Sequence, residues 1–235
     1  MDNINRHSKV ELVDYMGSDL TVVNAARVSF NKESDWEEIP FNDSGAAKTL
    51  KSGDEKLITY LAEHGHWSPF SHCTLTFRIS APIFVARQLV KHQIGLAWNE
   101  VSRRYVTYEP DIWFPTMWRR QDDNKKQGST NKEISSPSIA DHVYEDASRH
   151  AIAAYESLIN LGVCAEQARA VLPQAMFTEW YWTGSLYAFA RVYNLRTHST
   201  AQAETKEVAI QIGHHAEQKF PVSWYSITKR LNKNG

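Results

Sequence analysis

The stretch from Arg87 to Tyr105, RQLVKHQIGLAWNEVSRRY, gathers side chains that could hold an anion. Its basic or potentially basic residues are Arg87, Lys91, His92, Arg103 and Arg104. One carboxylate, Glu100, accompanies them, together with Ser102. A solvated helix would intersperse acids among its bases, whereas this composition offers the charge-assisted hydrogen bonds that a phosphate needs. The stretch therefore predicts a phosphate site, and the alternative is a basic surface favoured by a helix C-terminus.

Two elements are expected to position these residues. Alternation of apolar and polar residues over 74–80 predicts a strand. Helical spacing after it predicts a helix with Pro82 in its first turn, so that Arg87 and Lys91 lie one turn apart on one face. Residues 94–101 are then expected to form the turn that leads to Ser102.

The rest of the chain predicts an α+β fold. A second strand is expected at 176–183. Helices are expected at 19–27, 54–63, 139–160, 165–172, 185–195 and 202–220. Asp19 is the expected N-cap of the first of these helices, and Ser185 is the expected N-cap of the helix at 185–195. Residues 31–53 and 119–136 are polar and predict loop insertions. Because strands and helices do not alternate regularly, we expect one domain over 1–235 with a mostly antiparallel sheet packed against long helices.

Bulk properties narrow the function classes. The chain has 235 residues, a formal net charge of -1 and 42% hydrophobic residues. A balanced charge gives no field for a long polyanion, so no nucleic-acid partner is expected. No apolar run approaches membrane length, and the first residues lack a signal peptide's apolar segment, which predicts a cytoplasmic protein with no membrane contact. Two cysteines fit a reducing compartment.

The basic stretch resembles the signature of the flavin-dependent thymidylate synthases. Lys91-His92-Gln93 stands where that family has Arg-His-Arg, and Asn99-Glu100, Ser102 and Arg104-Tyr105 match it directly. Further similar blocks follow in the family's order: VELVDYMG at 10–17, AARVSF at 25–30, HGHWSPFSH at 64–72, ARAVLP at 168–173, NLR at 194–196 and AQ at 201–202. Two features depart from it: Lys91 and Gln93 replace arginines, and one extra residue separates Gln93 from Ser102.

The resemblance implies a reaction. Deoxyuridine monophosphate (dUMP) would be converted to thymidine monophosphate, with methylenetetrahydrofolate as carbon donor and NADPH-reduced FAD as hydride donor. No cysteine nucleophile would take part, and neither Cys73 nor Cys164 lies beside a signature pair of a base and the residue that orients it. The family also implies a homotetramer with shared active sites.

The resemblance also assigns residues. Arg196 is the catalytic residue, an electrostatic partner of the ionising uracil; read without the family it would be a cation in the last turn of a helix. The residues expected to bind dUMP are Gln88, Lys91, Glu100, Val101, Ser102, Arg103, Arg104, Arg169 and Arg196. The residues expected to bind FAD are His66, Ser68, Lys91, His92, Gln93, Asn99, Glu100, Ser185, Tyr187 and Arg191. No metal is predicted.

Some of the same residues are also compatible with three other interpretations of the sequence. The aromatic content and the arginine-rich turn are compatible with an RNA-binding module, although no RNA-binding motif is present. A hydrolase of deoxyuridine nucleotides would use the same basic stretch but needs a metal-binding carboxylate set. A zinc site is the alternative for His64, His66, His72 and Cys73, yet no second cysteine or acid completes it at the usual spacing.

Overall fold

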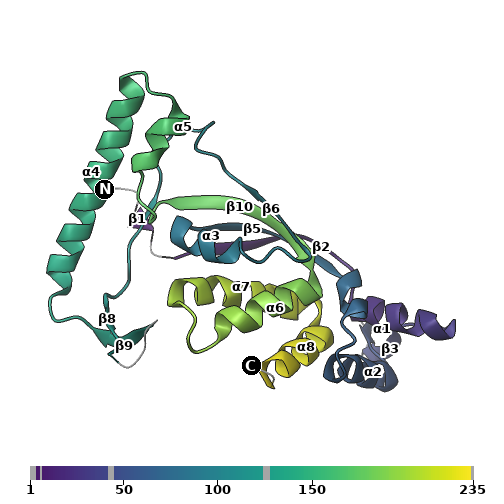
Figure 1. Ribbon diagram of the computed structural model, residues 1–235. Coiled ribbons are helices and arrows are strands. Elements are labelled where there is room, and N and C mark those ends of the chain that lie inside the picture. Colours follow the sequence, from purple (N-terminus) through teal and green to yellow (C-terminus); the bar gives the residue numbers. More distant parts are fainter. Residues whose placement is uncertain (1–3, 6, 42–44, 124–127, 234–235) are drawn as a thin grey trace.

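A four-stranded antiparallel sheet forms the centre of the protein in a computed structural model, which describes residues 4–5, 7–41, 45–123 and 128–233 (Figure 1). The strands run in the order β2-β5-β10-β6. Their bounds are Lys9–Met16 for β2, Thr74–Pro82 for β5, Leu96–Glu100 for β6 and Phe177–Ser185 for β10. The expected α+β class with a mostly antiparallel sheet is confirmed.

The two central strands form because apolar side chains alternate along them. On β5, Leu75, Phe77 and Ile79 are fully buried, while on β10 the indoles of Trp180 and Trp182 point into the same core. The full register from Phe177 opposite Pro82 to Ser185 opposite Thr74 keeps these side chains on one face. The strands predicted at 74–80 and 176–183 are therefore confirmed, each slightly longer than expected.

Helices cover that face of the sheet. They are α3 (Ile83–Leu89), α6 (Leu186–Thr197), α7 (Ala203–Lys219) and α8 (Pro221–Lys233). Figure 1 shows α3, α6 and α7 lying against the sheet, with α8 beyond them. The predicted cap of α6 is confirmed, since Ser185 Oγ accepts a hydrogen bond from Ala188 N at 3.2 Å.

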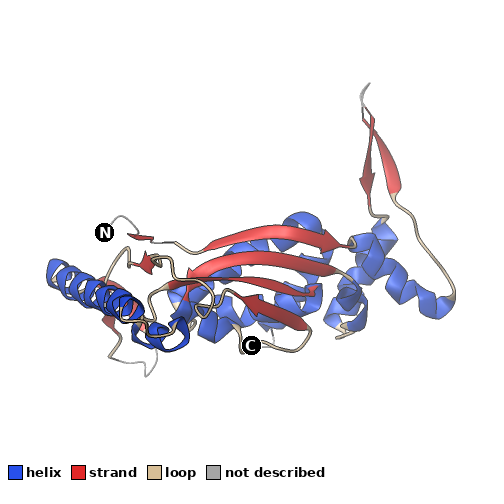
Figure 2. Ribbon diagram, turned by 90° about the horizontal axis from the view of Figure 1, so that it is seen from above, coloured by secondary structure: helices blue, strands red, loops and turns tan. Residues whose placement is uncertain are grey.

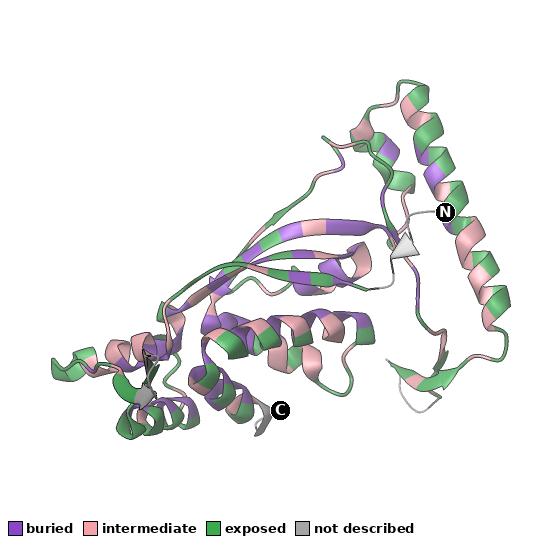
Figure 3. Ribbon diagram, turned by 180° about the vertical axis from the view of Figure 1, so that it is seen from behind, coloured by how far each residue is buried: buried purple, intermediate pink, exposed green. Residues whose placement is uncertain are grey.

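Two helical groups lie at opposite ends of the sheet. One holds α1 (Asp19–Arg27), η1 (Val28–Phe30), α2 (Ser52–Glu63) and η2 (Ser68–His72). The other holds α4 (Pro137–Asn160), α5 (Ala165–Ala168) and η3 (Arg169–Val171), so the helix expected at 165–172 is shorter and tightens into a 3₁₀ turn. Figure 3 shows exposed and half-buried residues along the whole of α4, whose buried residues are Ser148, Ile152 and Tyr155.

The two predicted loop insertions form hairpins instead. Residues 31–53 contain β3 (Glu37–Phe41) paired with β4 (Gly45–Thr49). Figure 2 shows this pair projecting from the helical group at one end of the sheet. Residues 119–136 contain β8 (Arg119–Gln121) paired with β9 (Ser129–Glu133). Local backbone pairing, which polar composition does not reveal, explains both corrections. Residues 42–44 and 124–127 within these insertions lie outside the described residues.

The prediction that Asp19 caps the first helix was wrong. Ser18 is the N-cap residue, and its N–H donates to Thr21 Oγ1 at 3.0 Å. The buried carboxylate of Asp19 instead accepts from the N–H groups of Val222 and Ser223 at 3.1 and 2.9 Å. It thereby satisfies the first turn of α8, a helix that the sequence did not predict because Pro221 was interpreted only as the end of α7.

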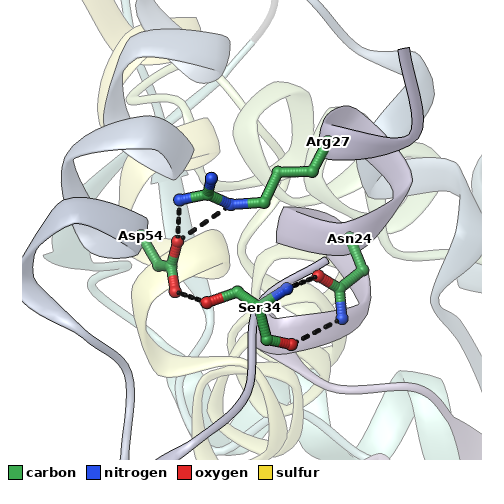
Figure 4. A network of polar contacts seen from close by, with 4 residues as sticks. All are labelled: Asn24, Arg27, Ser34 and Asp54. Carbon is green, nitrogen blue, oxygen red and sulfur yellow. Dashed lines mark hydrogen bonds and ion pairs between the residues drawn. The ribbon is translucent and has the colours of Figure 1, made fainter. Parts of the chain in front are cut away.

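A buried polar cluster fastens the β3–β4 insertion to the helices beside it (Figure 4). Asp54, 1% exposed, accepts from Arg27 Nη2 at 2.5 Å and from Ser34 Oγ at 2.5 Å. Ser34 N donates to Asn24 Oδ1 at 2.8 Å, and Asn24 Nδ2 donates to Ser34 O at 3.0 Å. The start of the insertion is therefore an anchored part of the fold.

A short parallel pair completes the fold. It joins β1 (Ile4–Asn5) to β7 (Ile112–Trp113). Over the described residues, none of the helices has both the length and the apolar character needed to cross a membrane.

Candidate active site

The helix that precedes the basic stretch is shorter than the sequence suggested. α3 ends at Leu89, with Val90 as its C-cap, and Pro82 ends β5 instead of occupying the first helical turn. Lys91 and His92 therefore follow the helix, and the expected placement of Lys91 one turn beyond Arg87 was wrong. A turn closed by His92 N donating to Leu89 O at 3.0 Å holds them.

The segment expected to be a turn, 94–101, is largely the edge strand β6. Gly95 enters it with a φ of 74°, a conformation that favours glycine. Leu96 then pairs with Gly184 of β10. A side chain at position 184 would meet Gly95 O at 2.7 Å and Leu96 Cδ2 at 2.3 Å, so this close approach requires glycine. The two halves of the basic stretch are thus fixed at opposite ends of β6.

The first half meets the C-terminal end of α6. Arg196 Nε donates to His92 Nε2 at 3.0 Å, and Arg196 Nη2 donates to the backbone carbonyl of Gln88 at 2.8 Å. The structure therefore brings together three residues assigned to the site from separate parts of the chain. A solvated helix-terminal cation would not make these contacts, and the guanidinium is only partly exposed.

The electrostatics of this group assign a charge to each member. Burial, followed by the nearby charges of Arg196 and Arg191, lowers the pKa of His92 from 6.5 to about 4. Burial also lowers the pKa of Arg196, but a guanidinium remains protonated at neutral pH. His92 is consequently neutral, and because its Nε2 accepts from Arg196, its proton is on Nδ1. Nδ1–H is then available as a donor.

The residues assigned to FAD lie partly around this group. Lys91, Gln93 and Arg191 are exposed. Tyr187, one turn before Arg191 on α6, packs against Trp67 with ring centroids 6.1 Å apart. Ser185 uses its Oγ as the α6 cap. Ser68 begins η2, which contacts α6, and His66 lies two residues before it.

Strand alternation separates two residues that were assigned to the same ligand. Asn99 pairs with Tyr181 and Glu100 with Trp180, so their side chains point to opposite faces of the sheet. Glu100 is held on the helix-covered side, where Oε1 accepts from Thr178 Oγ1 at 2.8 Å and Oε2 accepts from Trp98 Nε1 at 3.1 Å. Asn99 is exposed on the open face.

The second half of the basic stretch turns sharply after β6. Tyr105 N donates to Ser102 O at 2.9 Å, and Arg104 N donates to Ser102 Oγ at 3.3 Å. Arg104 is exposed and lies over the Tyr105 ring at 5.3 Å. These two N–H groups are used within the turn, whereas the Ser102 hydroxyl and the exposed Arg104 guanidinium are groups that can donate to a phosphate.

Arg103 differs from its neighbours because it is buried, at 7% exposure. Its Nη1 donates to Tyr108 O, and its guanidinium lies 4.4 Å from the centre of the Tyr108 ring. Together with Val101 and Thr178 it lines a pocket of about 350 Å³ beneath residues 108–111. Burial by Tyr108 gives this residue a structural role in holding the turn.

The structure does not bring Arg169 to the other assigned residues through any described hydrogen bond or ion pair. It is exposed at the start of η3, and its Nε donates to Glu166 O at 3.3 Å. The sequence did not predict the residues that hydrogen-bond to two of the assigned side chains. Thr178 and Trp98 donate to the Glu100 carboxylate, and Gln202 and Thr205 hydrogen-bond to the Gln88 amide. The AQ block at 201–202 was the one local signal that could have found Gln202.

The histidine cluster does not resemble a metal centre. His64 Nδ1 lies 2.9 Å from Tyr60 O, and its ring stacks on Tyr60. Cys73 is buried, and its Sγ donates to Ser18 O at 3.4 Å. Within the described parts of the chain, no group of three or more His, Cys, Asp or Glu side chains could hold a metal ion.

Comparisons with known proteins agree with this arrangement. Residues 11–222 match the family described as thymidylate synthase complementing protein. A flavin-dependent thymidylate synthase of Kosmotoga olearia is 37% identical over 92% of this chain and 87% of its own length. Another, from Thermosipho africanus, is 35% identical over 94% of this chain and 90% of its own length.

Solved structures share the fold. The UMP/dUMP methylase PolB from Streptomyces cacaoi, bound with 5-Br dUMP, matches with a TM-score of 0.84 and 28% identity, covering 98% of each chain. The same enzyme bound with 5-Br UMP matches with a TM-score of 0.82 and covers 98% of this chain and 97% of that one. This likeness, together with the cationic residues that lie before and after the edge strand β6, places the chain in the nucleotide-methylase class. Within that class, the chain belongs to the flavin-dependent thymidylate synthase family.

Proposed function

We propose that this protein converts dUMP to thymidine monophosphate, taking the carbon from methylenetetrahydrofolate and the hydride from FAD that NADPH has reduced. The observation that supports this most directly is the contact of Arg196 with both His92 and Gln88. It holds a guanidinium against the basic stretch, and the proposed reaction requires a fixed positive charge beside the uracil ring. The family's relatives carry the corresponding activity in their names.

In this proposal the chain's own residues bind and polarise the nucleotide. Arg196 stabilises the negative charge that develops on the uracil ring, and its two hydrogen bonds hold it in place before the substrate arrives. Gln88 orients the nucleotide beside it. The Ser102 hydroxyl and Arg104 bind the phosphate, and Glu100 accepts from a sugar hydroxyl.

The residues present fit a flavin. Lys91 and Arg191 are exposed cations next to His92, and they can neutralise a diphosphate. The His92 Nδ1–H and the amide of Gln93 can donate to a ring or a ribose. The bound flavin supplies a hydride that no side chain can provide. The half-buried Tyr187 and the exposed Trp67 beside it offer a surface for stacking adenine.

The direct test of the proposal is purification followed by turnover. The protein should be yellow and should form thymidine monophosphate from dUMP when methylenetetrahydrofolate and NADPH are present. UMP serves as the comparison substrate, because the neighbouring methylase acts on both nucleotides. A colourless protein that binds no added FAD, or one that methylates UMP alone, would refute the proposal.

We expect catalysis without a cysteine nucleophile. Burial, and secondarily the charge of Asp19, raises the pKa of Cys73 to about 12, so its thiolate does not form at neutral pH. Cys164 is the exposed N-cap of α5. Cys73→Ser can keep the hydrogen bond to Ser18 O, and both Cys73→Ser and Cys164→Ser should retain turnover within about twofold in a product assay. Loss of turnover with flavin and dUMP still bound would implicate a thiol.

Flavin binding should respond to the third signature position. Gln93 is exposed, and its side chain cannot neutralise a diphosphate as arginine would. We expect Gln93→Arg to tighten FAD binding by about tenfold in a fluorescence titration, since charged hydrogen bonds contribute more than neutral ones. Ile94→Arg, which adds the same charge at the next exposed position, is the control. Equal tightening in both variants would point to a general charge effect.

The assembly is proposed to be a homotetramer with shared active sites. The two halves of the signature lie at opposite ends of β6, and Asn99 and Glu100 face opposite sides of the sheet. Exposed apolar residues also remain on the open face, including Tyr181, and on α4, including Ile139 and Val143. We expect light scattering to give four times the chain mass. A monomer with full synthase activity would contradict this expectation.

A further inference from the structure

The amide of Gln88 is held by a chain of polar contacts that begins on the β8–β9 hairpin. Arg119 Nη2 donates to Glu204 Oε1 at 2.8 Å, and Gln202 Nε2 donates to Glu204 Oε2 at 2.9 Å. Gln88 Nε2 donates in turn to Gln202 Oε1. Thr205 Oγ1 completes the chain by donating to Gln88 Oε1 at 3.2 Å. An unbroken relay therefore links a surface hairpin to a residue assigned to the nucleotide.

The chemistry of the relay fixes the direction of each amide. An ionised carboxylate can only accept hydrogen bonds, so Gln202 must turn its NH₂ group toward Glu204. The side-chain oxygen of Gln202 then faces Gln88, so the NH₂ group of Gln88 must donate to it. The oxygen of Gln88 is left to face Thr205. One acceptor-only group thus decides which side of the Gln88 amide donates and which accepts.

The burial of Glu204 and its ion pair with Arg119 strengthen this preference for one orientation of the amides. Its side chain is 8% exposed, and that of Arg119 is 27% exposed. Hydrogen bonds to a charge are stronger than neutral ones, and a buried carboxylate needs a cation beside it. Arg119 is itself anchored, because its Nε donates to Ser129 Oγ at 2.8 Å across the hairpin. The polar hairpin accordingly supplies the counter-charge of the relay.

We propose that Glu204 and Arg119 are positioning residues for the nucleotide, acting through Gln202 on the orientation of the Gln88 amide. This proposal rests on the proposed function, in which Gln88 binds the nucleotide. An amide that can flip offers two opposite donor–acceptor patterns, whereas a fixed amide offers one. The backbone carbonyl of Gln88 also accepts from Arg196 Nη2 at 2.8 Å, so the relay ends directly beside the catalytic guanidinium.

The test replaces the acceptor-only group. In Glu204→Gln the new amide can present either NH₂ or oxygen, which frees Gln202 and Gln88 to flip. We expect the Kd of dUMP, titrated into the FAD-loaded protein, to rise by about tenfold, the effect of one lost oriented hydrogen bond. KM should rise with it, while kcat changes less. The control is Glu207→Gln on the same helix, since Glu207 Oε1 contacts His7 Nδ1 at 3.2 Å and lies outside the relay. It should bind dUMP within about twofold of the parent.

A second variant controls for destabilisation of the fold by an unpaired charge. Glu204→Gln leaves Arg119 half-buried without its charge partner, so Arg119→Met combined with Glu204→Gln removes both charges together. The double variant should melt closer to the parent and still bind dUMP about tenfold more weakly. Parent-like dUMP binding in either folded variant would overturn the proposal.

A double-mutant cycle separates positioning from general damage. In a Gln88→Met background the amide is gone, so Glu204→Gln should cause no further loss of dUMP affinity. Additive losses would overturn the relay. If Gln88→Met itself leaves dUMP binding unchanged, the nucleotide role of Gln88 fails, and with it the proposed assignment. Weak binding in Gln88→Met with parent binding in Glu204→Gln would overturn the relay alone.

Discussion

Arg196→Ala should lower the rate of thymidine monophosphate formation by on the order of 10²–10³-fold, the usual effect of removing one preorganised donor from a site where negative charge develops. FAD should remain bound and NADPH should still reduce it, because the variant leaves the exposed cations Lys91 and Arg191 in place. Flavin reduction and product formation are therefore measured separately on the same preparation. Product formation at the parent rate would show that this arginine is only a helix-terminal cation.

Arg196→Lys is the matched variant for geometry. Arg196 uses two different nitrogens, Nε toward His92 and Nη2 toward Gln88 O, and a lysine ammonium cannot reproduce that planar arrangement. We expect little recovery of turnover despite the retained charge. Recovery to within tenfold of the parent would mean that charge alone suffices.

The pKa of His92 provides a separate measure of its contact with Arg196. Its pKa in the folded protein, about 4, lies below the ordinary value of 6.5, so its neutral form stabilises the fold above pH 6.5, and that contribution is lost as the pH falls toward 4. The charge of Arg196 is one cause of the lowered value. In Arg196→Ala the pKa of His92, followed by NMR, should therefore rise. An unchanged pKa would leave burial and the charge of Arg191 as its causes.

Patterns confined to single elements predicted those elements well. The strands at β5 and β10 follow from period-two burial, as with Leu75, Phe77 and Ile79, and the α6 cap follows from a serine placed before a helical run. β6 did not follow from its sequence, because Leu96 and Trp98 make an apolar stretch that suits several structures. It is a strand because Gly184 leaves room for it beside β10.

The candidate site was predictable where motif order carried the information. Arg196 and His92 were assigned from separate blocks, and the fold joins them over 104 positions of sequence. Arg119 could not be found this way, because its partner Glu204 lies 85 positions away and its hairpin is uniformly polar. The prediction for Asp19 was wrong for a similar reason. A carboxylate suits the N-terminus of a helix, but the helix that Asp19 caps lies at the other end of the chain.

The largest expected effect on stability concerns Trp180, which couples the core to the signature strand. It is 1% exposed and stacks on Trp98 with ring centroids 4.3 Å apart, directly opposite Glu100 in the register of β10 and β6. Trp98 in turn donates to Glu100 Oε2. Trp180→Ala should lower the free energy of unfolding by about 3–5 kcal/mol, the usual cost of emptying a buried indole site, as measured by denaturant titration.

The same variant should also weaken dUMP binding, because Trp98 loses the indole on which it stacks and keeps only its edge-to-face contact with Trp182, so that the donor to Glu100 is less firmly held. Trp224→Ala is the matched control: this indole is 3% exposed, lies on α8 and packs edge-to-face on Tyr193 with centroids 5.3 Å apart. Its removal should cost a similar free energy of unfolding but leave dUMP affinity, measured well below either melting temperature, near that of the parent. If both variants lose affinity equally, the loss reflects general destabilisation, and the indole stack does not position Glu100.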